Sequence, residues 1–346
     1  MRVCCCTSFT FAYAPRALVL AETVRRAHPG WTLAAAVVDR HPTDVPSGAL
    51  LPEFDIVLGA EGLGIPDVGR WLFRHELVEA CTAVKGALLN RLLDLGFEAV
   101  IYLDPDTALF APLTPVLSAL DSSSIVLTPH QSVPNLREQA LVDNEMTSLL
   151  YGTYNLGFIA VRNDAAGRAF GAWWAAMLHR ACYDEPERGL FTDQRYIDLV
   201  PGLFDGVHVL RDPGCNVASW NLSTRRVTAA ADGALLVNGS TLRFFHFTKV
   251  GGIGDVMLER YGGDQVEVHE LLAWYRRRLD RHAGRGAGQD WHYGRFSNGV
   301  PIPRGARRLY RTRPDLVAHF AAPFDADGAD TYHGWLLHEH PGLLAG

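Results

Sequence analysis

Asp104 and Asp106 are the residues of this sequence whose type and spacing point most directly to chemistry. They lie two positions apart, directly after the apolar stretch 99–103, which predicts a buried strand. Pro105 between them stiffens the turn. Mg²⁺ and Mn²⁺ prefer oxygen ligands and often share them with substrate phosphates. The pattern therefore predicts a metal site at the end of a strand; the alternative is an Asp-Pro-Asp turn without a ligand.

A histidine lies near the end of a second apolar stretch, at 242–247, and a lysine follows it three positions later. His246 is suited to be a third ligand for Mn²⁺, and Lys249 can neutralise a diphosphate leaving group. The alternative for His246 is a core histidine whose hydrogen bonds are satisfied within the protein.

Two further pairs can contact a sugar. Asn155 stands beside Gly157 ahead of a predicted strand, which suits close approach to a sugar, although an ordinary turn has the same composition. Asp193 and Gln194 stand at the start of a predicted helix, where they can bind sugar hydroxyls or cap the helix.

Amide and aromatic side chains also occur together at Asn216 and Trp220. This combination suits stacking on a sugar face while its hydroxyls are hydrogen-bonded, so we expect both residues near an acceptor. The alternative is simple packing of a C-terminal part of the chain over the sheet.

Alternating strands and helices must position these residues. Strands are expected at 2–6, 33–38, 55–58, 99–103, 124–128, 156–161 and 242–247, and helices at 15–27, 83–94, 165–181 and 268–281. Such alternation predicts an α/β fold with a mainly parallel sheet flanked by helices. Ligands of such sheets bind beyond the carboxyl ends of the strands, where Thr7, Asp39 and Asp104 would lie.

Composition narrows the possible partners. Of the 346 residues, 48% are hydrophobic and 20% charged, which predicts a substantial core. The net charge of -6 without a basic stripe argues against nucleic acid. No apolar run approaches the ~18 residues of a membrane span. Six cysteines without Cys-x-x-Cys spacing favour reduced thiols and a cytoplasmic location over a zinc ribbon or a disulfide framework.

The motifs taken in order resemble the GT-A glycosyltransferases, in particular the family 8 retaining enzymes. The resemblance spans roughly residues 1–255 and rests on Tyr102-Leu103-Asp104-Pro105-Asp106, Tyr154-Asn155-Leu156-Gly157-Phe158, Thr192-Asp193-Gln194 and His246-Phe247-Thr248-Lys249. It implies a GT-A (Rossmann-like) fold in which Asp104, Asp106 and His246 bind Mn²⁺ (or Mg²⁺).

The resemblance also implies roles for the remaining residues. Asp193 and Gln194 would lie beside the anomeric carbon as catalytic residues, and Asn155, Gly157 and Lys249 would contact the donor. From their own types and positions we also expect Thr7, Ser8, Phe9, Asp39, Lys85 and Asp104 to bind the nucleotide sugar; the alternative for Asp39 and Lys85 is an ordinary surface or capping role.

The predicted activity is transfer of a hexose from a nucleotide-diphosphate sugar, a UDP-sugar, to a hydroxyl of a glycan, a lipid-linked or a small-molecule acceptor, with retention. The predicted catalytic domain is 1–255, with a nucleotide-sugar half at about 1–130 and an acceptor half at about 131–255. Residues 256–346 form a helical and aromatic extension packed on it. Two alternatives are a nucleotidyltransferase acting on sugar phosphates and a non-catalytic carbohydrate-binding relative.

Overall fold

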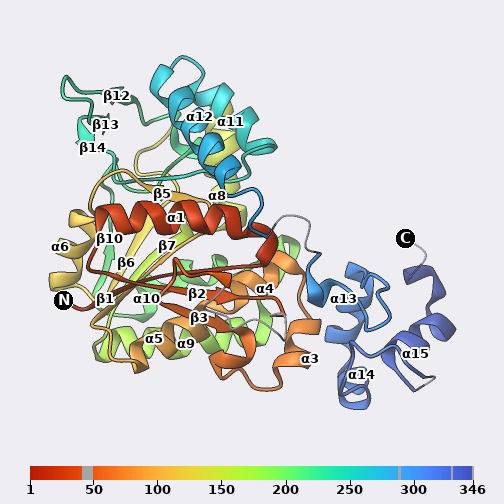
Figure 1. Cartoon of the computed structure of the whole chain (residues 1–346). Coiled ribbons are helices and arrows are strands. Elements are labelled where there is room, and N and C mark those ends of the chain that lie inside the picture. The colour runs from red at the N-terminus through yellow and green to blue at the C-terminus, as the bar shows by residue number, and fades with distance from the viewer. Residues whose placement is uncertain (41–49, 287–289, 329, 345–346) are drawn as a thin grey trace.

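A seven-stranded sheet forms the centre of the molecule (Figure 1). The computed structural model describes residues 1–40, 50–286, 290–328 and 330–344. The strand order is β10-β6-β7-β4-β1-β2-β3, and only β7 runs antiparallel to its neighbours. The strands are β1 (Val3–Phe9), β2 (Thr32–Val37), β3 (Ile56–Gly59), β4 (Ala99–Leu103), β6 (Ile125–Pro129), β7 (Tyr154–Arg162) and β10 (Val207–Val209). The predicted α/β fold with a mainly parallel sheet is confirmed.

Helices cover both faces of this sheet, which explains why its strands are apolar throughout rather than alternating. Helices α1 (Ala14–Ala27) and α6 (Thr114–Ser122) pack on one face, and α5 (Lys85–Asp94) and α9 (Ala165–Ala181) on the other. All seven residues of β1 are buried.

The helix predicted over 83–94 is present as α5, which begins two residues later than expected. A separate helix, α4 (Leu77–Ala83), ends just before it. Gly86 packs against the backbone of Ala175 in α9, so closely that a Cβ at Gly86 would lie 2.6 Å from the Ala175 Cα. The break therefore places Lys85 at the start of a helix that is pressed against its neighbour.

A smaller three-stranded sheet lies next to the central one. It consists of β11 (Val217–Ala218), β15 (Phe244–His246) and β5 (Thr107–Leu109), with β15 antiparallel to β5. Helices α11 (Ile253–Gly262) and α12 (Val266–Arg281) cover it. Strands β12 (Val227–Ala229), β13 (Leu235–Val237) and β14 (Ser240–Thr241) form a further antiparallel sheet.

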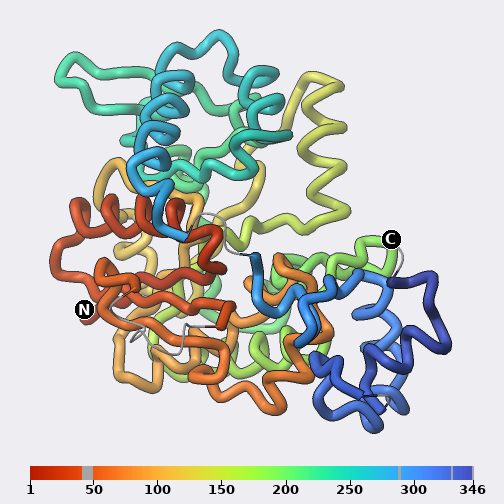
Figure 2. Tube along the Cα trace, turned by 45° about the vertical axis from the view of Figure 1, so that its right-hand side comes forward, coloured from red at the N-terminus to blue at the C-terminus, as the bar shows by residue number. Residues whose placement is uncertain are grey.

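The C-terminal part of the chain forms its own apolar cluster beside the sheet (Figures 1 and 2). It contains α13 (Arg304–Thr312), α14 (Pro314–His319) and α15 (Tyr332–Glu339). The buried Arg307 of α13 donates to the carbonyl oxygens of Phe73 and His75, which joins this cluster to α3 (Val68–Phe73).

Shorter elements connect these layers. They include α7 (Glu138–Ala140), a π-helical turn (Leu141–Met146), α8 (Thr147–Tyr151), β8 (Asp184–Glu185), β9 (Leu190–Phe191), α10 (Val200–Leu203) and 3-10 turns at Phe11–Tyr13, Ala60–Leu63, Pro186–Arg188, Arg195–Leu199, Ser219–Asn221, His292–Gly294 and Pro341–Leu343. Among the described residues, no helix combines the length and the hydrophobicity needed to cross a bilayer.

Candidate active site

Asp104, Asp106 and His246, here called the metal group, converge on one point. The two aspartates follow β4, and the turn they form leads into β5. His246 pairs with Thr107 across the β15–β5 ladder, which brings it to that turn. The His246 Nε2 lies 3.0 Å from the Asp106 Oδ1 and 3.8 Å from the Asp104 Oδ2.

The metal group fits a divalent cation. Each residue offers one ligand atom, and these atoms lie within 4.8 Å of one another. Two carboxylate oxygens and an imidazole nitrogen suit Mn²⁺, and Mg²⁺ through the oxygens.

Mutual attraction governs the charges of Asp106 and His246. Burial raises the pKa of Asp106, but the charge and hydrogen bond of His246 outweigh it, and the net pKa is lowered. Burial lowers the pKa of His246, but Asp106 and Asp104 outweigh it, and the net pKa is raised. The two groups thus favour an ion pair where no cation separates them.

A buried lysine links the metal group to Asp193. The Lys85 Nζ lies 3.2 Å from the Asp104 Oδ1 and 2.9 Å from the Asp193 Oδ2, and it donates to the Leu156 carbonyl at 2.9 Å. Burial lowers the pKa of Lys85, but the two carboxylates raise it well above its ordinary value. Burial raises the pKa of Asp193, and Lys85 offsets only part of this. Lys85 is therefore a fixed cation between a metal-group carboxylate and Asp193.

A chain of hydrogen bonds from Ser8 through Tyr102 reaches the carboxylate of Asp104. The Tyr102 hydroxyl donates to the Asp104 Oδ1 at 3.0 Å and lies 2.8 Å from the Ser8 Oγ. The Ser8 Oγ donates to the Cys81 carbonyl at 2.7 Å. The hydroxyl of Ser8, which we expected to bind the nucleotide, thus belongs to an internal chain of hydrogen bonds.

Asn155 lies against His246, and Gln194 lies against Asn155; neither the turn expected as the alternative for Asn155 nor the cap expected for Gln194 is found. Asn155 belongs to β7 and is not in a turn. Gln194 precedes a 3-10 turn but makes no side-chain cap bond, and Asp193 is bonded instead to Lys85. Their amides contact each other, because the Asn155 Nδ2 donates to the Gln194 Oε1 at 3.4 Å.

The predicted acceptor residues lie beside His246. The Trp220 ring stands edge-on to the His246 ring with centroids 5.2 Å apart, and the Asn216 Nδ2 donates to the Asn155 Oδ1 at 3.0 Å. The Asn216 Oδ1 and the Trp220 Nε1 are buried without a hydrogen-bond partner among the described residues. Buried polar atoms without a partner are uncommon in folded proteins and often mark places where water, an ion or a ligand binds.

His130 belongs to this cluster and was missed from the sequence. Its Nδ1 lies 3.2 Å from the Thr153 carbonyl, and its Nε2 lies 3.3 Å from the Asn155 Nδ2. Burial lowers its pKa to about 4, so the ring is neutral at pH 7. Its place directly after β6, at the carboxyl end of a strand, is the signal that could have indicated it.

The other expected nucleotide residues are more scattered. Thr7 is buried, and Phe9 packs in the core with its ring centroid 6.0 Å from that of Phe54. The Asp39 Oδ1 accepts from the backbone N–H groups of Arg40 and His292, both at 3.0 Å. Asp39 is therefore already occupied in joining β2 to the C-terminal part of the chain.

Strained backbone occurs beside the candidate residues. Three of the five non-glycine residues with positive φ are Thr192 (45°), Asn216 (55°) and the exposed Lys249 (51°). This conformation is rare for a β-branched residue such as Thr192, and strain of this kind clusters at functional sites. The surrounding structure therefore keeps Thr192, next to Asp193, and Asn216 in conformations that cost stability.

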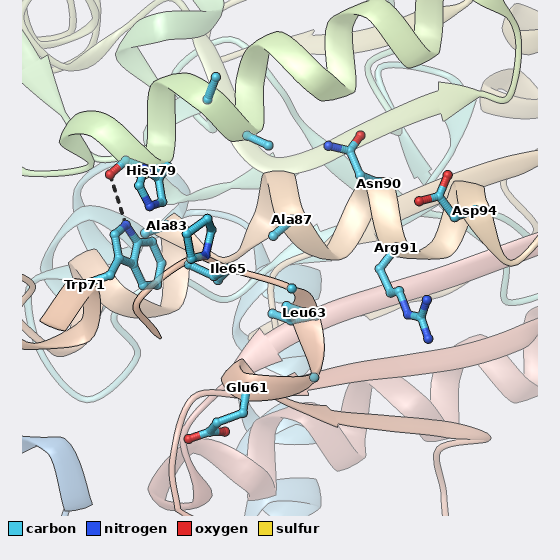
Figure 3. Close-up of a pocket in the computed structure, with 15 residues that line it drawn as sticks. Glu61, Leu63, Ile65, Trp71, Ala83, Ala87, Asn90, Arg91, Asp94 and His179 are labelled. Atoms are coloured by element: carbon cyan, nitrogen blue, oxygen red, sulfur yellow. Dashed lines mark hydrogen bonds between the residues drawn. The ribbon is translucent and has the colours of Figure 1, made fainter. Parts of the chain in front are cut away.

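A groove of about 790 Å³ lies elsewhere, between the loop after β3 and helices α5 and α9 (Figure 3). Asn90, Arg91 and Asp94 of α5 and His179 of α9 line it, and the Trp71 Nε1 donates to the His179 carbonyl at 3.0 Å. None of the predicted site residues lines this groove.

Comparisons with known proteins give partial matches. No protein-family model matches the chain. The uncharacterized protein YfnF of Bacillus subtilis is 30% identical over 199 residues, which cover 56% of this chain and 65% of that protein. The uncharacterized protein YfnD of the same organism is 29% identical over 178 residues, covering 49% of this chain and 53% of that protein. The chain thus spans less than two thirds of the length of either relative.

The similar solved structures are glycosyltransferases. The galactosyltransferase LgtC, in complex with donor and acceptor sugar analogs, has a TM-score of 0.41 at 14% identity, covering 76% of this chain and 96% of that one. Mouse xyloside xylosyltransferase 1 in its apo form has a TM-score of 0.38 at 17% identity, covering 62% and 86%.

Proposed function

We propose that the chain is a metal-dependent glycosyltransferase that moves a hexose from a nucleotide-diphosphate sugar, a UDP-sugar, to an acceptor hydroxyl with retention of configuration. The observation that carries this proposal is the convergence of Asp104, Asp106 and His246 next to the buried pair Lys85–Asp193.

Charge balance supports a divalent cofactor. Of the three carboxylates in this cluster, those of Asp104 and Asp193 pair with Lys85, and that of Asp106 lies against His246. With His246 neutral, the cluster carries two uncompensated negative charges, which a divalent cation would cancel. When bound, Mn²⁺ or Mg²⁺ supplies electrostatic stabilisation of the diphosphate as the glycosidic bond breaks.

The protein residues would divide the remaining work. Asp104, Asp106 and His246 hold the cation, and Asp193, kept beside Lys85, faces the positive charge that develops at the anomeric carbon. Asn216 and Trp220 offer their unpaired polar atoms to the acceptor. In the retaining course the leaving phosphate takes the acceptor's proton. The acceptor class is a glycan, a lipid-linked sugar or a small molecule.

Nucleotide-sugar turnover tests this proposal. Purified protein is incubated with a panel of UDP-sugars, with Mn²⁺ or with EDTA, and release of UDP is measured. The UDP-sugar used in this assay is first selected from the panel by thermal shift, because a tight ligand raises the unfolding temperature of the protein. We expect release with Mn²⁺ and none in EDTA. Full activity in the chelator would contradict the metal assignment. Proton NMR of the first product formed checks retention, and an inverted product would overturn that part alone.

A further inference from the structure

The stretch Asn155-Leu156-Gly157, which we expected to contact a sugar, touches both His246 and Asp104 of the metal group. The Asn155 Oδ1 lies 3.3 Å from the His246 Nδ1, and the Gly157 carbonyl accepts from the Asp104 N–H at 2.9 Å. We infer that this stretch positions the metal group. Asn155 is a positioning residue that determines which ring nitrogen of His246 carries the proton, and Gly157 leaves space for the His246 ring. The inference rests on the proposed metal-dependent function.

Main-chain groups fix the orientation of the Gln194 side-chain amide. The Gln194 Nε2 donates to the Tyr151 carbonyl at 2.8 Å, and the Gln194 Oε1 accepts from the Leu156 N–H at 3.2 Å. A carbonyl can only accept and a backbone N–H can only donate, so the amide of Gln194 has one possible orientation.

Gln194 and Gly157 in turn fix Asn155. The atom of Asn155 that faces the Gln194 Oε1 must be a donor, and the atom that faces the Gly157 N–H at 3.2 Å must be an acceptor. The Asn216 Nδ2 donates to the same Asn155 oxygen. Asn155 is therefore held from both ends, with its oxygen toward His246.

Asn155 then determines which nitrogen of His246 is free to bind a cation. Because the Asn155 Oδ1 only accepts, the His246 Nδ1 that faces it carries the proton. In the neutral ring the lone pair then lies on Nε2, the nitrogen that faces Asp104 and Asp106; in the ion pair Nε2 carries the second proton, which a bound cation would replace. Partners that fix the tautomer of a metal-binding histidine in this way raise metal affinity, typically about 10- to 100-fold.

Gly157 contributes space rather than a hydrogen-bonding side chain. A Cβ at this position would lie 2.3 Å from the His246 Cε1 and 2.6 Å from its Nδ1. Any side chain would therefore push the ring away from Asp104 and Asp106. This explains, from contacts within the chain, why an amide and a glycine stand two positions apart in β7.

Binding of Mn²⁺ to the full chain tests the inference without measuring transfer. Free Mn²⁺ is followed by electron paramagnetic resonance during titration, and nitrogen coupling to the bound Mn²⁺ reports the imidazole of His246. We expect Asn155→Leu and Gly157→Ala to weaken binding about 10- to 100-fold and to lose the nitrogen coupling. Asn155→Asp keeps the oxygen that faces the His246 Nδ1 but loses the donor to Gln194, so it should keep the nitrogen coupling and bind Mn²⁺ more tightly than Asn155→Leu.

A matched control separates this role from general damage to the fold. Asn163 is also an amide that bridges two main-chain groups, the carbonyls of Leu93 and Phe97, but it lies away from the metal group. Asn163→Leu should leave Mn²⁺ binding unchanged.

The possible failures can be told apart. Asn155→Leu that binds Mn²⁺ like wild type, nitrogen coupling included, would overturn this inference alone. The expected variant pattern without any nucleotide-sugar turnover would contradict only the proposed function. Wild-type protein that binds no Mn²⁺ would contradict both.

Discussion

Two buried cations in this molecule each lie between two carboxylates, yet only one of them stands at a candidate active site. Lys85 lies between Asp104 and Asp193. Arg311, in α13, lies between Glu79 and Glu185, and its side chain is only 3% exposed. Arg311 and Glu79 are 232 residues apart in the sequence, so this second group, the Arg311 cluster, joins the C-terminal part of the chain to α4 and β8.

The difference lies in what remains unpaired. In the Arg311 cluster, Glu79 also accepts from the N–H groups of Glu76 and Asp184, and Glu185 also meets Arg188. Both carboxylates of this cluster are therefore paired within the protein, and we call it closed in that sense, although the Arg311 Nε is buried without a hydrogen-bond partner among the described residues. At Lys85, by contrast, Asp104 and Asp106 have oxygens that converge with His246 on one point. A buried ionic group whose carboxylates are all paired serves attachment, whereas one with an excess of converging acceptors is prepared for a ligand.

Removal of one metal ligand should give the largest effect. We expect Asp106→Ala to lower nucleotide-sugar turnover about 1,000-fold or more, because several kcal/mol of charge stabilisation depend on the cation. The unfolding midpoint should fall little, since the change removes a carboxylate and not core volume. Turnover above a tenth of the wild-type rate would show that the metal group is not the reaction centre.

The strands that carry these groups could be predicted from local sequence, and the resemblance grouped Asp104, Asp106 and His246, but the pairing of strands that joins them could not be predicted. The stretch 99–103 is apolar throughout and ends at Asp104, so strand and site follow from adjacent residues. The contact of His246 with the aspartates depends on the pairing of β15 with β5, between segments far apart in the chain. The role of Lys85 was equally hidden, because it requires α5 to pack on α9 through Gly86.

Substitutions in the Arg311 cluster should lower the stability of the protein and leave its activity unchanged. Arg311→Met leaves Glu79 and Glu185 buried without their shared cation, which should cost about 3 kcal/mol in the free energy of unfolding. Urea unfolding measures this, while Mn²⁺ affinity should stay at the wild-type value. Arg308 contacts the same Glu185 but is half-exposed, so Arg308→Met should cost less than about 1 kcal/mol. Equal losses in the two variants would contradict the distinction between buried and exposed partners.

The smallest expected effect concerns the histidine beside the Arg311 cluster. His75 is fully buried between α3 and α4, and its Nδ1 donates to the Trp71 carbonyl at 2.7 Å. Burial, reinforced by the nearby guanidinium groups of Arg311 and Arg307, lowers the pKa of His75 to about 3. In the unfolded chain a histidine titrates near 6.5. Between these values the unfolded chain binds a proton that the folded chain does not, so folding stability falls as the pH falls below about 6.5.

Replacing the ring should remove that dependence. In His75→Phe the Trp71 carbonyl keeps its bond from the Arg74 N–H, so no acceptor is left unpaired. Between pH 7.5 and 5.5 we expect wild type to lose about 1 kcal/mol more unfolding free energy than the variant, measured by urea titration at each pH. If His75→Phe lost as much stability as wild type over this range, the ring would already bind a proton in the folded chain. The Arg311 cluster would then admit an extra charge, and its closed character would be wrong.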